Sequence, residues 1–183
     1  MPTAARARLL ATAERLFHAE GVRAVGVERL LAESGVGRAS FYRHFPGKDD
    51  LVLAVLEQRL ARWRAGLTAA VAQRGGGVLA VFDEIDAQAG DPEFRGCAAI
   101  NAMVEAADRG SPAHRIAAAH KEALAAWLGD LTGDADLGAT LLLLVDGALV
   151  TALRDPAAGA GRRARAVAER LLGQVVPGQV VAG

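Results

Sequence analysis

The stretch from Gly21 to Lys48 constrains the fold of this chain more than any other segment. It predicts two short helices, one over residues 27–34 and one that opens near residues 37–38 and is stopped by Pro46. Between them, Gly35 can take the left-handed backbone conformation that ends a helix without a side-chain clash. This order of helix, tight turn and helix predicts a helix-turn-helix, the geometry in which the second helix enters the major groove of DNA.

The same stretch, with the helix expected before it, carries a series of short motifs in a fixed order. The motifs are Leu16-Phe17 ahead of Gly21, then Ser34-Gly35-Val36, then Phe41-Tyr42-Arg43-His44-Phe45, and finally Pro46-Gly47-Lys48. In these motifs the chain resembles the N-terminal domain of the tetracycline-repressor (TetR) family of bacterial transcription regulators. The resemblance implies a helix-turn-helix DNA-binding domain over residues 1–48 and a ligand-binding and dimerisation domain over residues 49–183.

Composition limits the other classes of protein that this chain could represent. Hydrophobic residues make up 52% of the 183 residues, yet no charge-free apolar run reaches the ~18 residues of a membrane span. The N-terminal segment lacks the continuous apolar core of a signal peptide, so we expect a cytoplasmic protein with no membrane partner. The single cysteine, Cys97, excludes an internal disulfide and a cysteine-based zinc cluster, and we expect neither a metal nor a cofactor. We expect Cys97 to be a small buried hydrophobe, with a redox-sensing thiol as the alternative.

Charge is distributed unevenly, although the formal net charge is zero. Residues 1–64 hold eleven Arg and Lys against seven Asp and Glu, whereas residues 65–183 hold ten against fourteen. The excess of positive charge lies in the half that contains the helix-turn-helix, as the binding of phosphates requires.

Apolar residues recur at helical spacing through the rest of the chain, and no strand-like alternation interrupts them. We therefore expect an all-α protein of about nine helices. A first helix capped by Thr3 completes a three-helix N-terminal domain, and the following helices form a C-terminal body. The later helices are expected from residue 48 or 49 to about 73, from 78 to 90, and over residues 97–108, 113–131, 135–154 and 162–176.

The second helix of the helix-turn-helix supplies the candidate DNA contacts. The set comprises Arg38, Ala39, Ser40, Tyr42, Arg43 and His44, together with Lys48 just beyond the helix. Arg38 and Arg43 are the candidates for base edges, because arginine bonds guanine in a bidentate manner. By the resemblance, Tyr42 and Lys48 hold phosphates. Phe41 and Phe45 are expected to turn inward to the core.

The segment around residues 141–153 is apolar on almost every side, and such a helix must be buried on more than one face. The resemblance implies that the last two helices pair with those of a second subunit. We expect a homodimer that contacts its partner through Leu143, Val150 and Leu172 and binds a palindromic operator in double-stranded DNA. The alternative is that these helices only close the core of a monomer.

An effector site is expected in the C-terminal body. In the family the helices that carry Trp63, Phe82, Asn101, Met103, His120 and Trp127 line a cavity, and aromatic walls with a few polar anchors suit a small molecule. Among these, Asn101 is expected to be a buried polar group in an apolar helix. The alternative for each residue is ordinary core packing.

Two functions follow as hypotheses. The first is a transcriptional regulator, most simply a repressor, that leaves its operator when a small apolar or aromatic effector binds the body. The second is a helix-turn-helix DNA-binding protein without small-molecule input, constitutive or controlled by a protein partner. We do not expect an enzyme, since His114 and His120 are spaced for different helix faces and no nucleophile-base pattern accompanies them.

Overall fold

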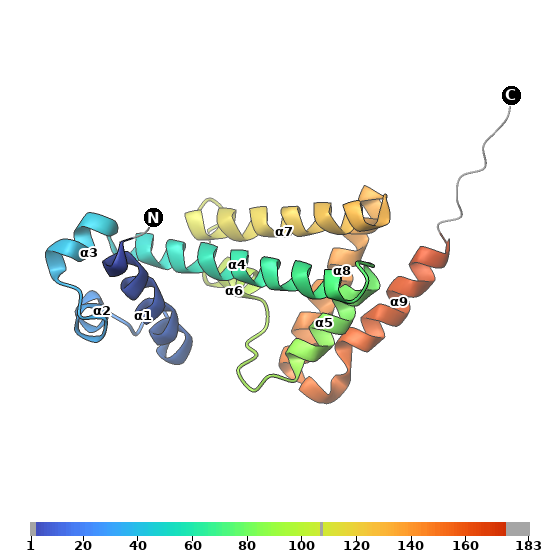
Figure 1. Ribbon diagram of the computed structural model, residues 1–183, viewed down its shortest axis with the longest axis horizontal. Helices are drawn as coiled ribbons and strands as arrows, with labels where there is room; N and C mark the ends of the chain where they lie inside the picture. The colour runs from blue at the N-terminus through green and yellow to red at the C-terminus, as the bar shows by residue number, and fades with distance from the viewer. Residues whose placement is uncertain (1–2, 107, 175–183) are drawn as a thin grey trace, which may run out of the picture. The chain divides into compact units, whose positions relative to one another are not determined.

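The structure is a computed structural model that describes residues 3–106 and 108–174, and every regular element within these residues is helical (Figure 1). The elements are α1 (Ala4–Glu20), α2 (Val27–Ser34), α3 (Arg38–His44), α4 (Lys48–Gln73), α5 (Leu79–Ala89), α6 (Ala98–Ala106), α7 (Pro112–Thr132), α8 (Ala135–Arg154), the short 3-10 helix η1 (Pro156–Ala158) and α9 (Ala160–Gln174). The all-α expectation is confirmed.

The chain forms two compact units, Met1–Ala61 and Arg62–Gly183, and α4 belongs to both. Its first turns carry Leu51, which is buried in the core of the first unit. Its later turns carry Leu67, which is buried in the core of the second. The units therefore divide within α4, beyond residue 48, because the start of this helix completes the first core. The functional roles assigned to the two parts of the chain remain predictions.

Local sequence explains how the first unit starts and turns. The side chain of Thr3 accepts a hydrogen bond from the backbone N–H of Arg6 and so caps α1. Gly35 ends α2 at φ 62° and ψ 23°, the left-handed conformation, and its N–H donates to Leu31 O. The next helix, α3, then begins only three residues later, which fixes the tight angle of the helix-turn-helix. Both sequence expectations, the Thr3 cap and the Gly35 turn, are confirmed.

In the second unit, α8 packs against α5, α7 and α9 (Figure 1). Two of these packings depend on glycine. A Cβ at Gly138 of α8 would lie 2.4 Å from Gly129 N of α7, and a Cβ at Gly161 of α9 would lie 2.5 Å from Phe82 O of α5. Only glycine allows backbones to approach this closely. These two positions set where α7 crosses α8 and where α9 crosses α5.

The C-terminal helix begins earlier than the sequence predicts. Asp155 caps a 3-10 turn, η1, and Gly159 leaves that turn at φ 61°, so the next helix can start at Ala160 instead of Arg162. The sequence pattern missed this because alanine and glycine carry little periodic signal. The expected end of the helix, at Val176, lies outside the described residues.

By length and composition alone, α8 is apolar enough to cross a membrane, and it is the one such helix among the described residues. Core helices of water-soluble proteins pass the same test. Here α8 buries Leu141, Val145 and Leu149 against the helices around it. Its composition is thus that of a core helix with one further apolar face.

Candidate nucleic-acid interface and effector region

The recognition helix α3 has a buried side and an exposed side. Phe41 and Phe45 are 0% and 3% exposed, as expected from the sequence, and fully burying a phenylalanine contributes about 1.5–3 kcal/mol. Tyr42 stands edge-on to Phe41, with ring centroids 5.1 Å apart, and remains 48% exposed. The buried phenylalanines therefore hold α3 in place while its opposite side faces solvent.

The predicted DNA contacts differ in how far they are exposed. Arg38, Ala39, Tyr42 and Arg43 are exposed, whereas Ser40, His44 and Lys48 are half-buried. All but Lys48 lie on α3, and Lys48 is the first residue of α4. The seven candidates thus lie on α3 and at the start of α4, and whether they contact DNA stays a prediction.

Arg38 is already paired within the free protein. Its Nη2 donates to the carboxylate of Glu28, which lies in the first turn of α2. Arg43 forms no such ion pair with the described residues. Glu28 was not predicted from the sequence. A signal was available, because opposite charges stand in the first turns of the two helices of the helix-turn-helix, Glu28 in α2 and Arg38 in α3.

His44 has a partner at the beginning of the chain. Its Nε2 and Thr3 Oγ1 share a hydrogen bond of 2.9 Å, and Arg6 lies 5.4 Å from the ring centroid of Phe45 as a cation–π contact. These contacts tie the start of α1 to the end of α3. His44 therefore helps to hold the start of α1 against the end of α3 in the free protein.

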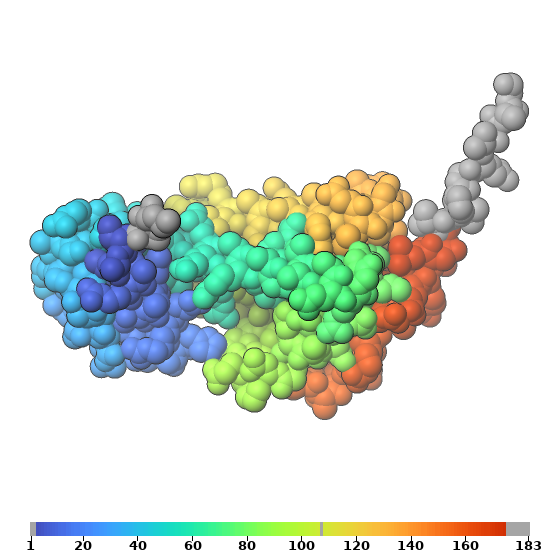
Figure 2. Space-filling view, in the orientation of Figure 1, coloured from blue at the N-terminus to red at the C-terminus, as the bar shows by residue number. Residues whose placement is uncertain are grey.

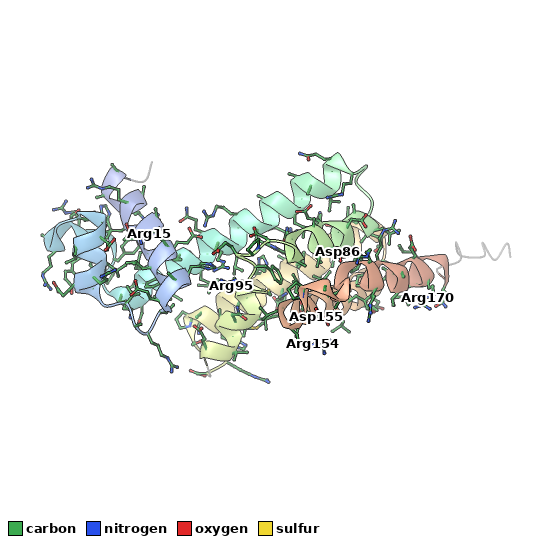
Figure 3. All side chains as sticks on the ribbon, turned by 90° about the horizontal axis from the view of Figure 1, so that it is seen from below. Arg15, Asp86, Arg95, Arg154, Asp155 and Arg170 are labelled. Atoms are coloured by element: carbon green, nitrogen blue, oxygen red, sulfur yellow. The ribbon has the colours of Figure 1, made fainter. Side chains whose placement is uncertain are left out.

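Ion pairs also join α1 to α2. Arg15, labelled in Figure 3, donates to Glu33 at 2.8 Å, and Arg29 reaches Glu33 at 3.4 Å and Glu20 at 3.6 Å. All four side chains are a third or more exposed, so each pair contributes little to stability. Arg15 and Arg29 therefore each face an acidic partner on the neighbouring helix.

In the second unit, three of the predicted effector residues lie in one region. Trp63 meets His120 edge-on, with ring centroids 5.7 Å apart, and its indole N–H donates to Gln88 Oε1 at 3.0 Å. Arg64 lies 4.9 Å from the ring centroid of Trp127. We call Trp63, His120 and Trp127, with these partners, the tryptophan region; it lies between α4, α5 and α7.

The other three predicted effector residues lie outside the tryptophan region. Phe82 is 0% exposed and belongs to the core of the second unit. Met103 is half-buried. Asn101 is exposed, and its Nδ2 donates to Arg95 O at 3.1 Å, so the expectation of a buried asparagine is wrong. The reason is that α6 packs mainly on α7, which leaves its other side uncovered.

Charged groups border the tryptophan region. Lys121 is buried and donates to Asp146 Oδ1. Burial lowers the pKa of His120, and the nearby positive charges of Lys121 and Arg64 lower it further, while Asp146 acts in the opposite direction. The lowered pKa favours the neutral form of His120, and the positive charge of Lys121 is balanced by the carboxylate of Asp146.

A groove of about 400 Å³ lies between α8 and α9. Leu143, Gly147 and Thr151 line it from α8, and Arg163 and Val167 line it from α9. Figure 3 shows Arg154 and Asp155 at the end of α8, where the chain turns towards α9.

The three predicted interface residues lie on the same two helices. Leu143 and Val150 are 73% and 52% exposed, whereas Leu172 is half-buried and packs against the core of the second unit. Leu143 is thus the predicted residue that the groove includes.

Figure 2 shows α9, in red, lying against α5, in green. Asp86 of α5, labelled in Figure 3, accepts a hydrogen bond from Arg162 of α9.

Within residues 3–106 and 108–174, no three His, Cys, Asp or Glu side chains gather as a metal site would require. Cys97 is half-buried and packs against the core of the second unit.

Comparison with known proteins identifies the family. The family described as bacterial regulatory proteins, tetR family, matches residues 9–55. A helix-turn-helix transcriptional regulator of Staphylococcus aureus is 38% identical over 55 residues, which is 30% of this chain and 30% of that relative. The chain thus matches less than a third of the length of this curated relative.

Solved structures extend the similarity over almost the whole chain. A TetR-family transcriptional regulator from Streptomyces coelicolor is 39% identical, with a TM-score of 0.81, and the match covers 96% of this chain and 91% of that one. The multidrug binding protein EbrR, solved with malachite green, is 22% identical with a TM-score of 0.73 and coverage of 93% and 98%, a likeness of fold. On the helix-turn-helix and this full-length similarity, the chain belongs to the TetR family of transcriptional regulators and carries that family's DNA-binding domain.

Proposed function

We propose that this regulator is a repressor that binds a palindromic operator through α3 and leaves it when a small molecule binds the second unit. The observation that carries the DNA part is the recognition helix itself, in which Phe41 and Phe45 are buried while Arg38 and Arg43 face solvent. The two arginines read guanine edges, and Tyr42 and Lys48 bind phosphates. The region of residues 1–48 is the DNA-binding domain in this proposal, and residues 49–183 form the effector and dimerisation domain.

The protein acts as a homodimer, since reading a palindrome requires two recognition helices. Two observations support an interface at α8 and α9: the apolar groove between them, and the exposure of Leu143 and Val150 on the same helices. Exposed leucine and valine side chains in one patch are typical of a surface that another protein covers. The half-sites would lie about one helical turn (~34 Å) apart, or a multiple of it.

For the effector, we propose an apolar or aromatic compound at the tryptophan region. The aromatic rings of Trp63 and Trp127 offer flat apolar surface, and His120 is held neutral by burial and by nearby positive charges. Because Asp146 neutralises Lys121, a strongly charged compound would gain little and lose its hydration. The binding of malachite green by EbrR, a protein of the same fold, supports a search among such compounds.

Helix α4 is the element that would couple the DNA-binding domain to the effector site, because Lys48 begins it in the first unit and Trp63 lies on it in the second. A ligand that prefers one conformation of α4 shifts the population of DNA-binding dimers, and only by its differential affinity for the two states. A coupling of about 1–3 kcal/mol would give several-fold or greater release. A protein with this activity works on DNA in the cytoplasm.

The alternative, a DNA-binding protein without small-molecule input, is favoured by one observation. The groove described above lies between α8 and α9, whereas in the tryptophan region Trp63 already contacts His120 and Trp127 already contacts Arg64. In that case the second unit serves only to dimerise the protein or to bind another protein.

The test begins with selection of bound duplexes from a randomised DNA library, followed by affinity measurements on the selected duplex. Losing an arginine–guanine pair costs about 1–3 kcal/mol, so Arg38→Ala and Arg43→Ala should each weaken binding about 5- to 150-fold. Unchanged affinity in both variants would refute the assignment of the contacts.

The effector part of the proposal needs a separate test. Aromatic compounds, with malachite green first, are then screened for quenching of tryptophan fluorescence and for release of the duplex. Trp63→Leu and Trp127→Leu are the variants that should lose the response. If the protein binds the duplex and no compound releases it, the alternative function is favoured.

A further inference from the structure

We propose that Glu28 is a specificity-determining residue of the DNA interface. Its ion pair orients the guanidinium of Arg38 for a base edge and disfavours contacts between Arg38 and phosphates. The inference rests on the proposed role of Arg38 in reading the operator. It concerns a residue of α2 that makes no base contact of its own in the proposal.

The contact joins the first turn of α2 to the first turn of α3. Glu28 is the second residue of α2 and Arg38 is the first residue of α3, so both side chains leave the start of a helix of the helix-turn-helix. Arg38 Nη2 donates to Glu28 Oε1. The side chains of Arg38 and Glu28 are 59% and 74% exposed, so packing constrains them little and the ion pair favours one position of the guanidinium over others.

A guanidinium carries five N–H donors in one plane, and a single bond from Nη2 leaves the others available. A guanine needs two of these donors, for O6 and N7. Arg38 can therefore stay bonded to Glu28 while it reads a base, and the ion pair limits the orientations of its guanidinium before it enters the groove. Pre-ordering the side chain reduces the conformational entropy that it loses on binding.

Non-specific DNA offers Arg38 only phosphates, which the protein neutralises wherever its cations reach. A phosphate contact by Arg38 brings the carboxylate of Glu28 near the negative DNA backbone, so this contact gains less free energy than one made by an arginine without an acidic partner. The ion pair thus weakens binding to non-specific DNA more than binding to the operator. Discrimination by such a repulsive element is a general route to specificity.

Arg43 provides a comparison on the same helix. It forms no ion pair with the described residues, so it is free to join either a base or a phosphate. The two arginines of α3 therefore differ in what they contribute. Arg38 contributes discrimination between the operator and other sequences, whereas Arg43 contributes both base reading and affinity for DNA of any sequence.

The experiment compares Glu28→Gln with Glu33→Gln on two duplexes. Glu33 also lies on α2, and its partners are Arg15 and Arg29, neither of which is on α3, so this control removes the same charge without touching Arg38. The duplexes are the library-selected sequence and a scrambled sequence of the same length and base composition. Affinities are measured by fluorescence anisotropy at two salt concentrations, after circular dichroism confirms folding.

For Glu28→Gln, binding to the scrambled duplex should strengthen about 1.4- to 5-fold, the range that corresponds to the release of an exposed ion pair. Binding to the selected duplex should change by less, so the ratio of the two affinities should fall. Glu33→Gln should change both affinities by the same factor. A ratio that Glu28→Gln leaves unchanged or raises, or that both variants lower equally, would overturn the inference.

A double-mutant cycle links the effect to Arg38. In an Arg38→Ala background, Glu28→Gln should leave the ratio of affinities unaltered, because the arginine that it controls is absent. If the ratio still falls in that background, Glu28 acts through another group and the inference is wrong. Arg38→Ala alone tests the proposed function: if it leaves the ratio of the wild-type affinities intact, Arg38 does not read the operator, and the role of Glu28 is refuted with it.

Discussion

The crossing of α7 and α8 at Gly129 and Gly138 allows one substitution whose effect follows from the distances in the structure. A Cβ at Gly138 would lie 2.4 Å from Gly129 N, 2.6 Å from Gly129 Cα and 2.7 Å from Ala125 O. All three atoms belong to the backbone of α7, so no side chain can rotate to make room. The two helices must separate instead. Part of the tryptophan region lies on α7, and part of the groove between α8 and α9 lies on α8.

The expected cost of Gly138→Ala combines two opposing effects. Overpacking a core typically costs about 1–3 kcal/mol. The gain in helix propensity from glycine to alanine recovers about 1 kcal/mol at most. When the full propensity gain is subtracted, the net destabilisation should reach up to about 2 kcal/mol, which lowers the melting temperature by up to roughly 8 °C in a protein of this size.

Gly66 on α4 is the matched control, because a Cβ at this position would meet nothing within 4 Å. Gly66→Ala should increase the free energy of unfolding by about 1 kcal/mol at most, through helix propensity alone. The melting temperature should rise accordingly. Both variants are compared with the wild type by thermal unfolding at one protein concentration. A Gly138→Ala protein as stable as Gly66→Ala would refute the close crossing of α7 and α8.

Three further predictions concern DNA, assembly and pH. Lys48→Ala should weaken binding to all duplexes and reduce the slope of log affinity against log salt by about 0.9, as the loss of one phosphate contact requires; an unchanged slope would exclude that contact. Leu143→Glu should give monomers in sedimentation experiments, while Val104→Glu, at a site 75% exposed on α6, should leave the dimer intact; dimers in both would argue against the α8–α9 interface. Since the folded state holds the pKa of His120 below its ordinary 6.5, the unfolded chain takes up the proton first, so the free energy of unfolding should fall as pH drops below about 6.5. The fall should be smaller in His120→Gln, and an equal fall in both would show that His120 does not cause it.

The sequence predicted the recognition helix well because its signals are local. Pro46 and Gly35 each act on their own part of the backbone, and the spacing of Phe41 and Phe45 fixes which side of α3 is buried. A resemblance to one family added the roles of Tyr42 and Lys48, which no local rule supplies.

What the sequence did not predict depends on contacts between distant segments. The pairing of Glu28 with Arg38 arises from the angle of the turn, and the bond between Thr3 and His44 joins residues that lie 41 positions apart. The exposure of Asn101 depends on which side of α6 meets α7. A helical pattern shows which residues share a face, but not which neighbour covers that face.

The central claim, that Arg38 and Arg43 read guanines in the major groove, is tested most directly by methylation protection on the selected duplex. Dimethyl sulfate modifies guanine N7, the major-groove atom to which arginine bonds. The wild-type protein should protect guanines in two symmetric half-sites, and Arg38→Ala should restore the reactivity of one guanine in each half-site while the others stay protected. A duplex that is bound tightly with no protected N7, or with protection that neither Arg38→Ala nor Arg43→Ala changes, would contradict the account.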